Sequence, residues 1–238
     1  MNHILAIIWD LDKTLYPFDE AFGIASQRAL VKMIVELKPE LTVAQATACA
    51  EPTYPMKTIE KLQFRFGLNP KEMFDRYYSH LDAGFLSPDP DFLQEMEEAS
   101  ARVSFGILSH CNRNWADRAL EQLGLSTLIT PDYRITDEDL SGQNKDKNLG
   151  PFRLILTRMQ VDAESALMVE DKNRNLRIAR QLGMETVLVT NGDEITACEH
   201  AQHVHQTGLA FLHSFNQQAQ RKRSSTHPRP VHGTSCII

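Results

Sequence analysis

The sequence predicts an α/β protein in which a doubly wound, Rossmann-like parallel sheet carries an inserted, all-helical cap domain. Two observations support this fold class. Short apolar runs without polar alternation recur along the chain, as expected of strands buried on both faces, and amphipathic stretches of helical period lie between them. After the first run, however, the pattern stays helical from residue 18 to residue 96. The alternation indicates βαβ units, and the helical interruption indicates a second domain inserted after the first strand.

Four apolar runs are the expected strands of the core, and they cover residues 4–9, 103–108, 166–169 and 186–189. Helices are expected between or beside them at residues 115–123, 151–159 and 173–182. Gly124 and Gly183 follow the first and last of these helices. Glycine is common at that position because it adopts the left-handed conformation that ends a helix.

The domain boundaries follow from this pattern. Residues 1–17 and 97–215 are expected to form the core, and residues 18–96 the helical cap over the carboxyl edge of the sheet. The expected helices of the cap are residues 21–37, 43–50, 58–66 and 70–81. The tail, residues 216–238, is rich in Gln, Arg, Ser, His and Pro and is expected to be disordered.

Composition and charge narrow the possible partners. The chain has 31 acidic against 25 basic residues, and the net charge of −6 argues against a nucleic acid polymer as partner. No stretch approaches the ~18 apolar residues of a membrane span, so no membrane partner is expected. The four cysteines lack metal-binding spacing, which predicts free thiols and a cytoplasmic location. The oligomeric state stays open.

The first strand ends in two carboxylates, Asp10 and Asp12, which share a face because residues two apart in an extended chain point the same way. Such a pair is tolerated when a cation lies between the carboxylates or one carries a proton. Phosphoryl transfer uses both the cation and the proton. One carboxylate binds Mg²⁺ and attacks phosphorus, and the other gives a proton to the leaving group and then takes one from water. A calcium loop is excluded, since Leu15 and Ala21 stand where that loop needs Gly and Glu.

Three further polar elements fall where such a site needs them. Ser109 follows the second strand, and Glu170 and Asp171 follow the third. Lys145 and Lys147 precede the next helix, and either could offset the charge of a phosphate. Because ligands of doubly wound sheets bind at the carboxyl ends of the strands, we expect these groups to meet in one site.

In this order the four motifs resemble those of the haloacid dehalogenase superfamily of aspartate-nucleophile hydrolases, over residues 4–212. The resemblance implies that Asp10 is the nucleophile and Asp12 the acid–base group. It implies phosphate contacts from Thr14, Ser109 and Lys145 or Lys147. It further implies a Mg²⁺ cofactor held by Asp10, the backbone carbonyl of Asp12, and Asp171, with Glu170 in support. The dehalogenase branch lacks the second aspartate and the metal, so the implied reaction is hydrolysis of a phosphomonoester through an aspartyl phosphate.

Residues 10–17 are also similar to the opening motif of the pyrimidine 5′-nucleotidase group, with Lys13 in place of its Asn and Ser109-His110 in place of a later Thr-Asn. This finer resemblance implies a small phosphorylated metabolite as substrate, a nucleoside 5′-monophosphate first and a sugar phosphate second. A phosphomutase is an alternative, and an inactive binding module is least favoured because the acidic motifs are intact. In the cap, the candidates for substrate selection are Tyr54, Lys57 and Arg65.

Overall fold

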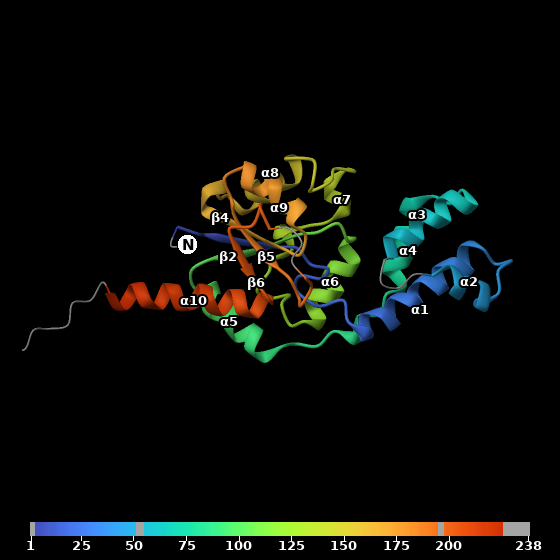
Figure 1. Cartoon of the computed structure of the whole chain (residues 1–238), viewed down its shortest axis with the longest axis horizontal. Coiled ribbons are helices and arrows are strands. Elements are labelled where there is room, and N and C mark those ends of the chain that lie inside the picture. Colours follow the sequence, from blue (N-terminus) through green and yellow to red (C-terminus); the bar gives the residue numbers. More distant parts are fainter. Residues whose placement is uncertain (1–2, 51–54, 195–197, 226–238) are drawn as a thin grey trace, which may run out of the picture.

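The computed structural model describes residues 3–50, 55–194 and 198–225 (Figure 1). In this part of the chain six strands form one all-parallel sheet in the order β3-β2-β1-β4-β5-β6. The strands are β1 (Ala6–Trp9), β2 (Ser104–Leu108), β3 (Arg134–Ile135), β4 (Ala166–Glu170), β5 (Glu185–Val189) and β6 (His203–His205). The predicted α/β, doubly wound class is confirmed.

The central strand β1 determines where the motifs meet. Its last residue, Trp9, is level with Ile107 of β2 on one side and Val169 of β4 on the other. Because all three strands are parallel, the residues that follow them leave the sheet at the same carboxyl edge. Asp10, Ser109 and the Glu170-Asp171 pair are therefore brought together by register alone.

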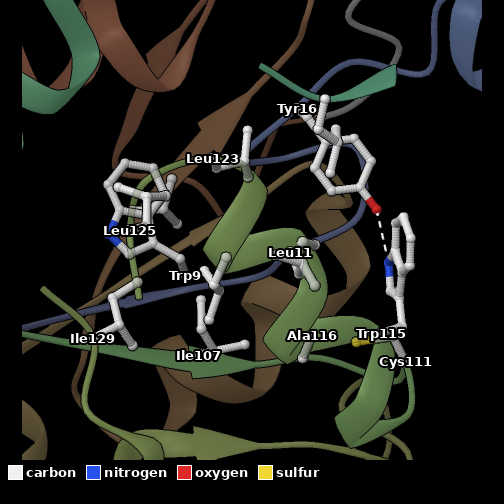
Figure 2. Packing of buried hydrophobic residues seen from close by; sticks show 14 of the residues in the cluster. Trp9, Leu11, Tyr16, Ile107, Cys111, Trp115, Ala116, Leu123, Leu125 and Ile129 are labelled. Atoms are coloured by element: carbon white, nitrogen blue, oxygen red, sulfur yellow. Dashed lines mark hydrogen bonds between the residues drawn. The ribbon is translucent and has the colours of Figure 1, made fainter. Parts of the chain in front are cut away.

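Helices cover both faces of the sheet, which explains why its strands show no polar alternation. Ala6 and Ile8 of β1 belong to the cluster under α8 (Gly150–Met159) and α9 (Asn173–Gln181). Ile7 and Trp9 belong to the opposite cluster, which includes residues of α5 (Pro90–Ser100), α6 (Arg113–Gln122) and α10 (Gly208–Ser225). Figure 2 shows part of this second cluster, with Trp9 and Ile107 packed among Leu123, Leu125 and Ile129.

The short strands and helices of the core were not predicted from the sequence. β3 has two residues, and the short helix α7 (Asp137–Leu140) has four. β6 is an edge strand of sequence His-Val-His whose side chains are partly or fully exposed, so it has no apolar run to detect. Three 3₁₀ turns, η1 (Ala83–Phe85), η2 (Pro131–Tyr133) and η3 (Ala163–Ser165), complete the connections.

Four helices form a lobe beside the carboxyl edge of the sheet (Figure 1). They are α1 (Glu20–Leu37), α2 (Val43–Cys49), α3 (Pro55–Phe66) and α4 (Pro70–His80), close to the helices expected from sequence. Asp19 caps α1 by accepting from the backbone of Phe22, and Asn69 caps α4 in the same way just before Pro70. Among the described residues no helix is both long and apolar enough to cross a lipid bilayer.

The expected boundary of the cap at residue 96 needs correction, because α5 covers the sheet. This helix packs against α10, and its Phe92 ring lies edge-on to Trp9 of β1 at 5.7 Å. Figure 1 shows α5 and α10 side by side, away from the helical lobe. The second part of the core therefore begins with α5, near residue 90.

The expectation of disorder from residue 216 is wrong for its first ten residues, because α10 continues to Ser225. The polar composition hid a buried contact. Asn216 is buried and its side chain amide donates to the backbone carbonyl of Glu95 at 2.9 Å, while its oxygen accepts from Arg102. The other polar residues of this segment can lie on the outer side of α10, so a polar composition does not prevent the helix from packing against α5. Residues 226–238 lie outside the described residues.

Candidate active site

The centre of the site is a buried lysine between two carboxylates. The ammonium group of Lys145 donates to Asp10, to Glu170 at 2.9 Å and to the carbonyl of Leu108 at 3.0 Å. Lys145 is only 2% exposed, although it comes from the loop before α8. Asp10 is fixed in turn by its backbone N–H, which donates to Val169 of β4 at 2.9 Å. The loop thus supplies a cation to the end of the central strand.

Lys147 does not reach this cluster. Its side chain is exposed and makes no hydrogen bond or ion pair with any residue that the structure describes. The two lysines lie two positions apart in a turn, where the backbone N–H of Lys147 donates to Asn144. The expectation that Lys147 belongs to the site is therefore wrong, and Lys145 is the lysine that meets Asp10.

Three carboxylates lie close together beside this lysine, which contacts two of them, Asp10 and Glu170. Asp10, Glu170 and Asp171 each offer an oxygen within 4.8 Å of the others. Both oxygens of Glu170 are occupied, one by the backbone N–H groups of Asp171 and Lys172, the other by Lys145 and the Asn175 amide at 3.0 Å. By contrast, Oδ1 of Asp171 is buried and accepts no hydrogen bond from the described residues, although the ammonium group of Lys172 lies 3.8 Å from it.

Burial makes this cluster electrostatically unbalanced. Burial first, and then the charge of Glu170, raise the pKa of Asp10 to about 6 and that of Asp171 to about 9. Burial is also the largest influence on Glu170 and would raise its pKa, but Lys145, the hydrogen bond from Asp171 and the charge of Lys172 together lower that pKa to about 2. The positive charges of Lys145 and of Lys172, whose Nζ lies 3.8 Å from Oδ1 of Asp171, do not offset three ionised carboxylates. At pH 7 these pKa values leave Asp10 and Glu170 ionised and Asp171 protonated.

The residues fit a bound magnesium ion. Mg²⁺ prefers carboxylate oxygens, and Asp171 presents a buried oxygen that the protein leaves without a donor. Asp10 and Asp171 would hold the ion, while Glu170, whose oxygens are already occupied, would orient its neighbours. When bound, such an ion would polarise a phosphate oxygen and offset the negative charge of the cluster.

Asp12 lies apart from these three carboxylates. Its Oδ1 accepts from the Tyr16 hydroxyl and from Nε1 of Trp115 at 3.2 Å, and its Oδ2 accepts from the Tyr78 hydroxyl at 2.9 Å. The side chain of Asp12 is therefore not part of the carboxylate cluster formed by Asp10, Glu170 and Asp171. The family resemblance assigned only its backbone carbonyl to the metal, and that assignment stays a prediction.

Thr14 and Ser109 are both buried at the same edge, at 3% and 1% exposure. The Thr14 hydroxyl lies 3.4 Å from Oδ2 of Asp10, in a turn where Lys13 adopts a left-handed backbone with φ of +64°. Ser109 directly follows β2, and its hydroxyl oxygen accepts from the backbone of Cys111 at 3.3 Å. Since that bond uses the oxygen as acceptor, the Ser109 hydroxyl hydrogen is available for an anion.

His110 contributes a neutral ring at the border of the site. Burial, followed by the charge of Lys145, lowers the pKa of His110 to about 4. Its Nε2 accepts the backbone N–H of Lys145 at 3.3 Å, so the proton of the neutral ring resides on Nδ1. A histidine at this position therefore orders the lysine loop without adding a positive charge.

Sequence reasoning missed the residues around Asp12 and Glu170. The positions of Tyr16 and Asn175 along the chain gave a weak indication that they belong to the site. Tyr16 lies four residues after Asp12, and Asn175 lies in the first turn of the helix after the acidic pair. Tyr78 and Trp115 had no such indication, because only tertiary packing brings them to Asp12. Of the expected cap residues, Tyr54 lies outside the described residues, and Lys57 and Arg65 are exposed.

A family model agrees with this arrangement. The chain matches the model of the haloacid dehalogenase-like hydrolases over residues 7–189, which is most of its length and includes every motif described above. The chain belongs to the haloacid dehalogenase-like hydrolase family. The matched range includes the helical lobe as well as most of the core.

One curated relative is the ribulose-1,5-bisphosphate 5-phosphatase of Halopiger xanaduensis. It is 32% identical over 130 residues, which cover 53% of this chain and 52% of the relative. The chain thus spans about half the length of the curated relative that it matches.

Solved structures of the family share the fold at low identity. CbbY from Rhodobacter sphaeroides, in complex with phosphate, superposes with a TM-score of 0.65 at 15% identity, covering 88% of this chain and 96% of CbbY. A phosphatase of the family from Thermococcus onnurineus superposes with a TM-score of 0.62 at 17% identity, covering 91% and 98% of the two chains. At these identities the likeness concerns the fold.

Proposed function

We propose that this hydrolase cleaves small phosphomonoesters in a Mg²⁺-dependent reaction with Asp10 as nucleophile. One observation carries the proposal: a single buried lysine joins Asp10 to Glu170, with Asp171 beside them and one of its oxygens left without a donor. Such a cluster is costly to bury unless it binds a cation and an anion together. A divalent metal and a phosphate group supply that combination.

The residues divide the work of phosphoryl transfer. Asp10 attacks phosphorus, and the leaving oxygen departs with a proton from Asp12 as the aspartyl phosphate forms. Asp12 then removes a proton from water, which attacks the phosphorus and releases phosphate from Asp10. Lys145 and the hydroxyls of Ser109 and Thr14 bind the phosphate oxygens, on which charge develops during transfer.

Two substrate classes follow from separate lines of support. The opening motif at residues 10–17 resembles that of pyrimidine 5′-nucleotidases and supports a pyrimidine nucleoside 5′-monophosphate. The Halopiger relative, a ribulose-1,5-bisphosphate 5-phosphatase, supports a sugar phosphate. A phosphomutase would use the same residues but return the phosphoryl group to a bound sugar, so its product would be an isomeric sugar phosphate and not inorganic phosphate.

The proposed setting is the cytoplasm. The cysteines that the structure describes, Cys49, Cys111 and Cys198, are free thiols, as is usual for proteins of reducing compartments. Small phosphorylated metabolites are abundant there, and the proposed partner is such a metabolite and not a nucleic acid or a membrane.

The proposal is tested by phosphate release from a panel of nucleoside monophosphates and sugar phosphates. With Mg²⁺ we expect turnover of at least one ester, and an excess of chelator should abolish it. Ca²⁺ should inhibit, because its larger and looser coordination shell misplaces the attacking oxygen.

The matched variants are Asp10→Asn and Asp91→Asn. The first keeps the side-chain volume but removes the nucleophilic charge, so kcat should fall by at least about 1,000-fold. Asp91 is exposed on α5, and its variant should retain normal turnover. Substantial activity in folded Asp10→Asn protein, or full activity in excess chelator, contradicts the proposal.

A further inference from the structure

The acid–base carboxylate of Asp12 lies in a cradle of three aromatic side chains. Tyr16 follows it in the same loop, Trp115 comes from α6 of the core, and Tyr78 comes from α4 of the helical lobe. Tyr16 and Trp115 also bond to each other at 3.1 Å, as Figure 2 shows. All three aromatic residues are at most 6% exposed. The cradle thus combines groups from both parts of the molecule.

The two oxygens of Asp12 differ in what they can do. Oδ1 receives the indole N–H of Trp115, which can only donate. It also receives the Tyr16 hydroxyl, whose oxygen already accepts from Trp115 and whose hydrogen therefore points to Asp12. Oδ1 is consequently committed as an acceptor, and a proton placed on it would cost a hydrogen bond.

Among the residues that the structure describes, Oδ2 has one hydrogen-bond partner, the Tyr78 hydroxyl, which can act as donor or acceptor. A hydroxyl can donate to an ionised carboxylate and, after rotation, accept from a protonated one. A carboxylate oxygen also has two lone-pair directions, so Oδ2 can keep Tyr78 in one and face a leaving oxygen with the other. Oδ2 is therefore the oxygen through which Asp12 can exchange a proton without losing its support.

Tyr78 is itself held against the core at both ends. The guanidinium of Arg118 on α6 donates to the backbone carbonyl of Tyr78 at 2.6 Å and to that of Leu81 at 2.8 Å. The Tyr78 ring lies beside Trp115 with a centroid separation of 6.1 Å. The position of α4 against the core therefore determines where the Tyr78 hydroxyl meets Oδ2 of Asp12.

We infer that Tyr78 is a positioning residue, through which the docked helical lobe orients Oδ2 of Asp12 toward the leaving group. The inference rests on the proposed phosphatase function and assigns a role to this tyrosine within the same site. In the first step the proton of Oδ2 passes to the leaving oxygen as the bond to phosphorus breaks, and Asp12 becomes ionised. In the second step Oδ2 takes a proton from the attacking water, which restores it.

The neighbouring Tyr77 provides a matched control. It is also a buried tyrosine of α4, but its hydroxyl bonds to Ser26 of α1 at 3.1 Å, inside the lobe. Tyr78→Phe and Tyr77→Phe thus remove the same atom from adjacent positions. Only Tyr78→Phe removes a hydrogen bond to Asp12.

The test compares kcat/KM for phenyl phosphate and 4-nitrophenyl phosphate, which have similar shapes but different leaving groups. The nitrophenolate needs little protonation, and kcat/KM reports the step in which the leaving group departs. Tyr78→Phe should lower kcat/KM for phenyl phosphate about tenfold and for 4-nitrophenyl phosphate less than about threefold. Tyr77→Phe should change both by less than about twofold. An equal loss on both esters, or equal behaviour of the two variants, overturns the positioning role.

A second readout does not require activity. The chain has two tryptophans, and the indole N–H resonance of Trp115 should shift in Tyr78→Phe while that of Trp9, buried in the sheet core, stays in place. An unmoved Trp115 resonance overturns the contact itself. If the wild-type protein cleaves no ester, the proposed function fails and the role of Tyr78 in it fails too, even with the resonance shifted, so the two failures are distinguishable.

Discussion

At the scale of single residues, one buried cation organises the site. Lys145 contacts the nucleophile candidate Asp10 and the supporting Glu170, and both carboxylates hold its pKa above the usual range despite burial. Lys147, two positions away, is exposed. Because the two side chains are chemically identical, the difference in burial and contacts between Lys145 and Lys147 is due only to their positions in the fold.

Replacing these lysines tests that difference. Lys145→Met leaves two buried carboxylates without their cation, so the metal-free protein should lose roughly 3–5 kcal/mol of unfolding free energy. Phosphate release should fall by at least about 100-fold. Lys147→Met should stay within about 0.5 kcal/mol of the wild type. Urea denaturation and phosphate release measure both effects.

If Lys145→Met does not fold, the double variant Lys145→Met/Glu170→Gln should regain part of the stability, because it removes one of the two unpaired charges. A stable Lys145→Met protein, or a large loss in Lys147→Met, contradicts this account of the charge cluster.

At the scale of elements, the pairing of α5 with α10 closes one face of the sheet. Phe92 of α5 and Phe211 of α10 each lie edge-on to Trp9 at 5.7 Å. Between the two helices, Asn216 bonds to Glu95 and Arg102. A polar residue thus fastens the last described helix to the core.

Asn216→Ala should therefore destabilise the protein by about 1–3 kcal/mol, since it leaves Glu95 of α5 and the following Arg102, both partly buried, without these hydrogen bonds. The control is Gln218→Ala, two residues further along α10 and exposed, which should change stability by less than about 0.5 kcal/mol. Thermal or urea unfolding of the pair measures the difference. Equal stabilities would show that the extension of α10 past residue 215 contributes nothing to docking.

At the scale of the whole molecule, the parallel sheet concentrates acidic groups at one edge. The chain carries a net charge of −6, and three of its carboxylates, Asp10, Glu170 and Asp171, lie within 4.8 Å of one another at this edge. This concentration is a direct result of strand register, which no single residue controls. Metal binding should therefore be coupled to proton release.

Without metal, the pKa of Asp171 is raised to about 9, so this carboxyl holds a proton at pH 7. A metal ligand must be ionised, so Mg²⁺ binding at pH 7 should release about one proton per site and weaken as the pH falls toward the Asp10 pKa of about 6. Titration calorimetry in buffers of different ionisation enthalpy measures the number of protons released. Asp171→Asn should bind Mg²⁺ weakly without this release. Proton uptake, or binding independent of pH from 6 to 9, contradicts the prediction.

The sequence by itself determined the fold class, the four main strands, the helices of the lobe, and the placement of Asp10, Ser109 and Glu170 at strand ends. These features follow from local periodicity and from the parallel sheet, in which every strand ends at the same edge. Tertiary structure alone decided between Lys145 and Lys147, assigned α5 and the end of α10 to the core, and brought Trp115 and Tyr78 to Asp12. Those outcomes depend on packing between segments distant in the chain, and local propensity carries no information about which of two similar side chains becomes buried.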